Sequence, residues 1–117
     1  MYSISKEFAF EASHQLTGLP PEHKCSRLHG HSYKVVFVLE APDLNGAGFV
    51  RDYADLDAVR EYINGSLDHR HLNDVLGGNP TSERLAEHLY RRFERRFPEL
   101  TEVGVSETAS TWAVYRG

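Results

Sequence analysis

Apolar and polar residues alternate at the start of the chain. From Tyr2 to His14 the even positions are mostly apolar, while the odd positions carry small or charged residues. A period of two predicts a half-buried antiparallel strand, because successive side chains of a strand point to opposite faces. His14 lies at the end of this predicted strand, on its apolar side.

A second strand is predicted after a loop. The loop, Gln15–Arg27, contains a glycine and two prolines that interrupt regular structure. The segment His29–Glu40 is rich in Val, Tyr and Phe, which favour strands. One face of this strand carries His29, His31, Tyr33, Val35, Phe37 and Leu39. A turn at Asn45 and Gly46 and a short extended piece over Gly48–Arg51 are predicted next.

Two helices are predicted in the second half of the chain. Asp52 is the expected N-cap of the first, and Asp68–Asn79 is expected to be a loop. The second begins with Asn79 or Thr81 as its cap and ends at Pro98. The apolar residues at helical spacing are Leu56, Val59, Ile63 and Leu67 in the first helix, and Leu85, Leu89, Phe93 and Phe97 in the second.

The chain is expected to end in a hairpin of two strands, Glu102–Thr108 and Thr111–Tyr115. The order of strands, two helices and strands predicts an α+β fold, in which two helices pack on one face of an antiparallel sheet. The 117 residues show no repeat or linker, so a single domain over 1–117 is expected.

Composition narrows the classes of function. Lys and Arg number 13 against 17 Asp and Glu, a net charge of −4 that argues against nucleic-acid binding. The arginine-rich run Arg91–Arg96 is therefore interpreted as a solvated helix face. The longest apolar run, Val35–Leu39, is far shorter than the about 20 residues that a membrane span needs. No apolar signal segment stands at the start, so a cytoplasmic protein without membrane contacts is expected.

Histidines give the clearest chemical signal. His29 and His31 are two positions apart on a predicted strand, so their side chains point the same way, and His14 ends the preceding strand. Three imidazoles suit Zn²⁺ and leave its fourth position open, as in catalytic sites. The alternative is that these are ordinary surface or core histidines.

Cys25 is the only cysteine, which excludes an internal disulfide. Lys24 and Arg27 flank it, and nearby cations favour the reactive thiolate. Two alternatives stay open: an inert buried thiol, or a fourth zinc ligand that closes a structural site.

Two acidic residues also carry candidate chemistry. Asp68 precedes His69, and an aspartate can fix the tautomer of a histidine and raise its basicity, although a plain polar loop is an alternative. Glu107 shares strand parity with Val103 and Val105, and a carboxylate on an apolar face is costly without a partner. Such a carboxylate could bind an amidine-like ligand edge, or form a salt bridge.

Taken together, these segments resemble the 6-pyruvoyl-tetrahydropterin synthase superfamily over nearly the whole chain. Within it, the Leu-His-Gly-His form at Leu28–His31 resembles the bacterial 6-carboxytetrahydropterin synthase branch. The other matching segments are Phe8–His14, His23–Tyr33, Phe49–Tyr53, Leu67–Asn73, Asn79–Glu83, Glu107–Thr108 and Tyr115–Gly117.

The resemblance implies roles for particular residues. It makes His14, His29 and His31 the zinc ligands, Cys25 the catalytic base, Asp68 and His69 the relay partners, Glu107 the pterin anchor, and Thr81 and Ser82 part of the substrate pocket. His71 falls outside the family position and is expected to be structural.

The resemblance also implies a fold and a reaction. The fold would be a T-fold, with a four-stranded antiparallel sheet and two helices on one face, whose subunits assemble into a β-barrel as a homohexamer of two trimers. The enzyme would be a lyase that converts 7,8-dihydroneopterin triphosphate to 6-carboxy-5,6,7,8-tetrahydropterin, with release of acetaldehyde and triphosphate, in queuosine biosynthesis. The alternatives are an enzyme that stops at the 6-pyruvoyl product and a non-catalytic zinc-stabilised binding module.

Overall fold

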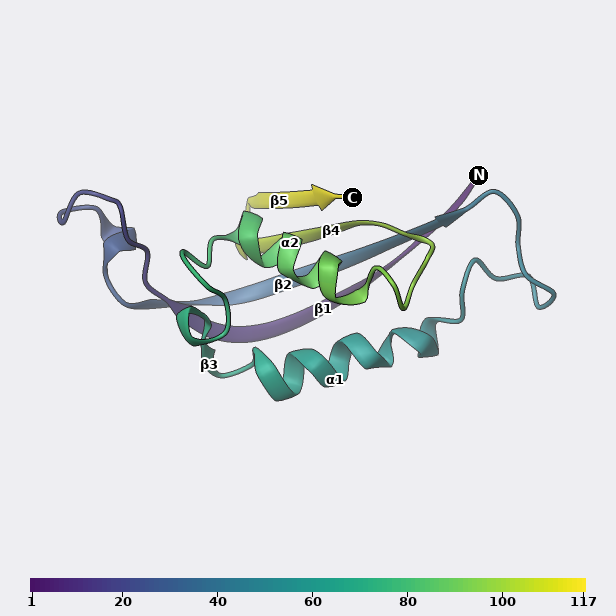
Figure 1. Cartoon of the computed structure of the whole chain (residues 1–117), viewed down its shortest axis with the longest axis horizontal. Helices are drawn as coiled ribbons and strands as arrows, with labels where there is room; N and C mark the ends of the chain where they lie inside the picture. Colours follow the sequence, from purple (N-terminus) through teal and green to yellow (C-terminus); the bar gives the residue numbers. More distant parts are fainter.

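The computed structural model describes all 117 residues and is built around one sheet of five strands. The strand order is β3-β1-β2-β4-β5 (Figure 1). The strands are β1 (Tyr2–His14), β2 (His29–Ala41), β3 (Arg70–His71), β4 (Leu100–Thr108) and β5 (Thr111–Arg116). The helices are α1 (Asp57–Ser66) and α2 (Ser82–Phe93), with short 3-10 turns at Lys24–Ser26, Tyr53–Leu56 and Leu72–Asp74.

Helices α1 and α2 cover one face of the sheet, as predicted, and the core lies between the two layers (Figure 1). Alternate side chains of β1, β2 and β4 point into this core, where removal of apolar area from water stabilises the fold. Fully buried members include Phe8, Val35, Phe37, Leu39 and Val105 from strands, and Leu56, Val59, Ile63, Leu85 and Leu89 from the helical segments. The opposite face, called the open face below, carries exposed residues such as Glu7, Glu11, Ser32 and Lys34.

The antiparallel register of β1 and β2 brings the predicted histidines together. His14 pairs with His29, and Ala12 pairs with His31. Because His14, His29 and His31 all lie on the core-facing parity of their strands, the three imidazoles gather at one end of the sheet.

The sheet differs from the predicted four antiparallel strands. The segment expected to be a loop, Asp68–Asn79, contains β3, which pairs parallel to β1 at Ala12 and Ser13. Two residues are too few to produce a periodic pattern, so the strand leaves no signal in the sequence. It forms because the chain next to it is tied to β1, where the His69 N–H donates to the Glu11 carbonyl at 2.6 Å.

The first helix begins later than predicted. Asp52 caps the 3-10 turn at Tyr53–Leu56, where its side chain accepts a hydrogen bond from the Ala54 N–H, and α1 starts only at Asp57. Leu67 lies just past the last turn of α1, yet it is fully buried. The helical spacing of buried apolar residues therefore extends one residue beyond the helix. The predicted extended piece Gly48–Arg51 is irregular instead.

The second helix begins at one of the two predicted caps and ends early. Thr81 is the N-cap, because its hydroxyl accepts from the Arg84 N–H, whereas the Asn79 side chain bonds to Thr17. α2 ends at Phe93, and Phe97 is buried from the turn that follows. Pro98 disfavours helical geometry at the residue before it, which fits this early end. Neither helix is long and apolar enough to cross a membrane.

Candidate functional site

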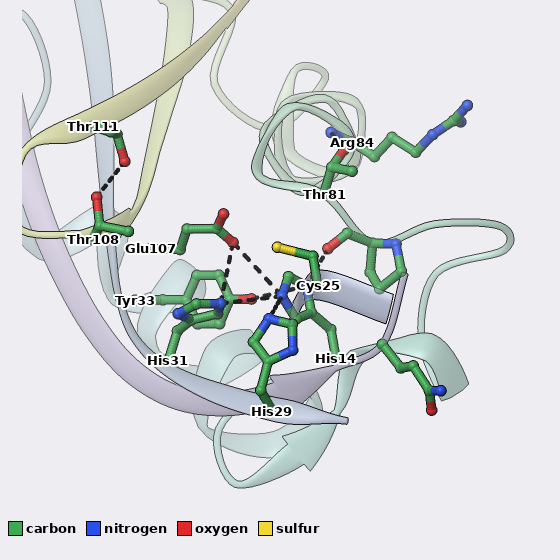
Figure 2. Close-up of polar contacts among 12 residues, drawn as sticks. His14, Cys25, His29, His31, Tyr33, Thr81, Arg84, Glu107, Thr108 and Thr111 are labelled. Carbon is green, nitrogen blue, oxygen red and sulfur yellow. Dashed lines mark hydrogen bonds and ion pairs between the residues drawn. The ribbon is translucent and has the colours of Figure 1, made fainter. Parts of the chain in front are cut away.

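Three imidazoles converge where β1 ends and β2 begins (Figure 2). We call His14, His29 and His31 the imidazole cluster; their ligand atoms all lie within 4.8 Å of one another. His14 Nε2 is 2.8 Å from His29 Nε2 and 3.1 Å from His31 Nε2. His14 is 1% exposed, so the cluster is rooted in the core and opens outward through the other two rings.

Backbone carbonyls fix which ring nitrogens carry protons. His14 Nδ1 lies 2.9 Å from the Pro80 carbonyl oxygen, and His29 Nδ1 lies 2.6 Å from that of Arg27. A carbonyl oxygen can only accept, so each Nδ1 holds the hydrogen and each Nε2 is left with a bare lone pair. Two bare lone pairs 2.8 Å apart repel each other unless a cation lies between them. The cluster therefore fits a divalent metal ion, and the two carbonyls orient the rings for it.

Burial also keeps His31 suited to metal binding. Desolvation lowers the pKa of His31, and the neighbouring Glu107 carboxylate raises it less strongly. His31 is therefore held in the neutral form that ligates metals. Tyr33 follows on the same face of β2; burial raises its pKa, so its hydroxyl, 3.3 Å from His14 Nδ1, stays protonated.

Glu107 reaches the imidazole cluster from the end of β4. Its Oε2 lies 3.8 Å from His14 Nε2 and 3.7 Å from His31 Nε2, beside the edge that these two rings form (Figure 2). This oxygen is buried and has no hydrogen-bond partner. The predicted parity of Glu107 is correct, since its carboxylate points to the same side of the sheet as the cluster.

Cys25 lies in the loop that joins the two strands carrying the cluster. Figure 2 shows its sulfur pointing toward the imidazoles and Glu107 from the short turn at Lys24–Ser26. The loop is held in place because the Cys25 N–H donates to His23 Nδ1 at 3.0 Å and the Cys25 carbonyl accepts from Leu16 at 3.0 Å. The thiol is free and partly exposed. Its sulfur is not among the atoms that meet within 4.8 Å, which separates it from the three imidazoles.

The predicted substrate segment also adjoins the cluster. Thr81 and Ser82 follow Pro80, the residue whose carbonyl holds His14. Ser82 is 8% exposed, and its hydroxyl oxygen is buried without a hydrogen-bond partner. The start of α2 is thus packed against the site, at a position that the sequence motif indicated.

Asp68 and His69, called the relay pair below, form the contact that their adjacency suggested. Asp68 Oδ2 lies 3.0 Å from His69 Nδ1, and Asp68 Oδ1 accepts from the Glu11 N–H at 3.0 Å. The Glu11 hydrogen bond, followed by that of His69, lowers the pKa of Asp68. His69 has a φ of 58°, a left-handed backbone conformation that is rare for residues other than glycine. Such local strain is typical of functional positions.

No hydrogen bond or ion pair joins the relay pair to the imidazole cluster within this chain. His69 borders a cavity of about 450 Å³ that is lined by Glu11, Ser13 and Ser32, whose side chains belong to the open face, and also by His31 of the cluster. The cluster belongs to the opposite, core-facing parity of the same strands. His71 lies in this cavity too, with its Nδ1 3.0 Å from the Ser13 hydroxyl.

Sequence reasoning missed the residues that position the ligands. The carbonyls of Pro80 and Arg27 leave no mark in a sequence, because any residue offers a carbonyl. Tyr33 could have been found, since it follows His31 by two positions on the same predicted face.

The sequence matches a known protein family over nearly its whole length. The sequence model of the family described as 6-pyruvoyl tetrahydropterin synthase matches residues 3–117. The chain belongs to this family. The resemblance expected from the sequence motifs is confirmed, and the α+β fold class with it.

Individual relatives agree with this assignment. A 6-carboxy-5,6,7,8-tetrahydropterin synthase of Synechocystis sp. is 40% identical and is matched over 98% of this chain and 93% of its own length. Human 6-pyruvoyl tetrahydrobiopterin synthase is 31% identical, over 97% and 90% of the two chains. The solved structure of 6-pyruvoyl tetrahydropterin synthase from Caenorhabditis elegans aligns with a TM-score of 0.86 at 23% identity, covering 99% of this chain and 95% of that one. The last comparison confirms the T-fold arrangement of the subunit.

Proposed function

We propose that the protein is a zinc-dependent 6-carboxy-5,6,7,8-tetrahydropterin synthase. It would convert 7,8-dihydroneopterin triphosphate to the carboxypterin, with release of acetaldehyde and triphosphate, as a step toward queuosine. The observation that carries this proposal is the meeting of bare Nε2 lone pairs at His14 and His29 with Cys25 and Glu107 close by. The name and 40% identity of the Synechocystis relative support the carboxy product.

His14, His29 and His31 would hold the zinc. A zinc ion at this position would supply Lewis-acid polarisation of the oxygens on the substrate side chain. The donor set supports zinc, because three imidazoles are the protein ligands of several catalytic zinc sites.

Cys25 and Glu107 would act on the substrate from the same side of the sheet. The Cys25 thiolate would remove a carbon-bound proton, and the Glu107 carboxylate would accept the adjacent N–H groups of the aminopyrimidine ring. Thr81 and Ser82 would line the pocket. We expect Glu107→Gln to weaken pterin binding with little loss of thermal stability; unchanged affinity for a pterin analogue in calorimetry would argue against the anchor role.

The relay pair would act on the cluster of a neighbouring subunit. His69, oriented by Asp68, would move protons on the far side of the substrate. Within one chain no hydrogen bond or ion pair joins His69 to the imidazole cluster, and it lies beside a cavity of the open face, so a neighbouring subunit would supply it. Assembly into a barrel of trimers, and a hexamer in total, would bring the two faces together. It would also pair the free outer edge of β5, and unpaired edge strands favour association.

A second candidate is the same chemistry stopped at 6-pyruvoyl-tetrahydropterin, the product that the human relative's name favours. Mass spectrometry of the product formed from 7,8-dihydroneopterin triphosphate tests both. The carboxypterin with acetaldehyde supports the proposal, and the pyruvoyl compound supports the alternative. Failure to consume the substrate, together with sulfur in the first shell of the zinc by X-ray absorption, would instead indicate a structural zinc module. A cytoplasmic location stays a prediction.

A further inference from the structure

The Glu107 carboxylate has a buried oxygen for which the protein provides no hydrogen-bond donor. This oxygen, Oε2, faces two ring nitrogens at 3.7 and 3.8 Å. These distances exceed those of hydrogen bonds. In the neutral ring His14 Nε2 cannot donate, because the single hydrogen is held on Nδ1 by Pro80. A buried acceptor that faces another acceptor is costly unless a cation satisfies both.

The spacing of these atoms suits four ligands around one metal ion. Ligands about 2.0–2.1 Å from a tetrahedral Zn²⁺ lie roughly 3.3 Å from one another. The imidazole contacts of 2.8 and 3.1 Å and the two Glu107 contacts all differ from that value by about half an ångström or less. Glu107 Oε2 flanks the edge between His14 and His31, at similar distances from both ring nitrogens.

Charge favours the same arrangement. Three neutral imidazoles leave both positive charges of a zinc ion uncompensated in a largely buried site, and a buried charge requires a counter-charge. Glu107 is the one carboxylate that contacts the cluster. Cys25 is the other candidate for the fourth position, but its sulfur lies outside the set of convergent atoms.

We propose that Glu107 is the fourth zinc ligand when no substrate is bound, and that it leaves the metal to hold the pterin ring when substrate oxygens replace it. The inference rests on the metal site of the proposed function. It changes the expectation of an open fourth position, because the protein itself fills that position at rest. The Glu107 carboxylate would thus couple release of the fourth zinc position to recognition of the pterin ring.

Cobalt-loaded protein and imidazole as an external ligand test this exchange. Co²⁺ absorbs visible light according to its coordination, so added imidazole can be titrated spectroscopically without any turnover. A neutral probe is needed, because the loss of a nearby negative charge would by itself strengthen the binding of an anion. Wild type, Glu107→Ala and Glu107→Gln would be compared, with the fold of each checked by circular dichroism.

We expect imidazole to bind Glu107→Ala at least about tenfold more tightly than wild type, since no internal ligand competes for the position. We expect cobalt to bind that variant about 10- to 100-fold more weakly in chelator competition. Glu102→Gln is the matched control: Glu102 lies on the same strand and pairs with Arg116, so both affinities should stay at wild-type values.

The outcomes separate this inference from the proposed function. Equal imidazole affinity in wild type and Glu107→Ala, with cobalt bound to both, would overturn the role of Glu107 and leave the three-histidine site intact. Absence of stoichiometric cobalt or zinc binding by wild type would overturn the metal site itself.

Discussion

The imidazole cluster and the relay pair both adjoin the end of β1, but beside different faces of the sheet. His14 ends β1 on the core face, whereas the relay pair is bonded to the backbone of Glu11, beside a cavity of the open face. The cluster is built inside one chain, with its rings fixed by carbonyls of that chain. In the relay pair, Asp68 is partly buried, whereas 79% of the His69 side chain is accessible. This contrast underlies our proposal that one chain holds the metal site while its relay pair serves a neighbouring subunit.

The largest effect is expected from the core-facing region. His31→Ala removes one of the three imidazoles, and no fourth histidine belongs to the cluster to replace it. The variant should therefore lose most of its bound zinc and essentially all activity. Elemental analysis and product formation measure both. His69→Ala is the matched change on the open face, and it should lose activity while it keeps its zinc. Full zinc occupancy in His31→Ala would contradict the metal site.

The next largest effect is expected at Cys25, and it distinguishes a catalytic base from a zinc ligand. Cys25→Ala should keep zinc, fold and oligomeric state, because the sulfur lies outside the convergent ligand atoms. Turnover should fall about 10²–10⁴-fold, the usual contribution of a general base. Zinc content, melting temperature and product would be measured in one preparation. Joint loss of zinc and folding would mean that Cys25 is a structural ligand instead.

Mixed oligomers test whether the two regions act across subunits. His31→Ala and His69→Ala are each expected to be inactive alone. If a site combines the cluster of one subunit with the relay pair of another, random mixing at equal amounts restores about a quarter of the sites. Activity after joint refolding or co-expression measures this recovery. No recovery in verified mixed oligomers would mean that each chain completes its own site.

The two regions also differ in how far the sequence could predict them. His14, His29, His31 and Glu107 follow from strand parity, since a period of two decides which side chains share a face. The face taken by Asp68 and His69 does not follow from any period. It depends on a left-handed residue and on hydrogen bonds to Glu11, which is 57 positions from Asp68. The same long-range ties create β3 and turn an expected loop into a strand.

The smallest predicted effect concerns a histidine away from both regions. His88 on α2 is half-buried, its Nε2 is 2.6 Å from the Tyr62 hydroxyl, and the Arg92 guanidinium lies 3.9 Å from the centre of the Tyr62 ring. Burial lowers the pKa of His88 from its ordinary value of 6.5, and Arg92 lowers it further. The folded protein therefore binds this proton less readily than the unfolded chain.

Stability should consequently fall as the pH drops below about 6.5, because the unfolded state then binds more protons at His88. Above that pH the group is neutral in both states and contributes no pH dependence. His88→Gln keeps an acceptor for Tyr62 but cannot titrate, so its melting temperature should decline less than that of wild type between pH 7.5 and 5.5 in zinc-saturated buffer. The comparison between the two proteins cancels the titration of the imidazole cluster, which both share. Parallel melting curves over this pH range would show that His88 is as readily protonated in the folded protein as in the unfolded chain.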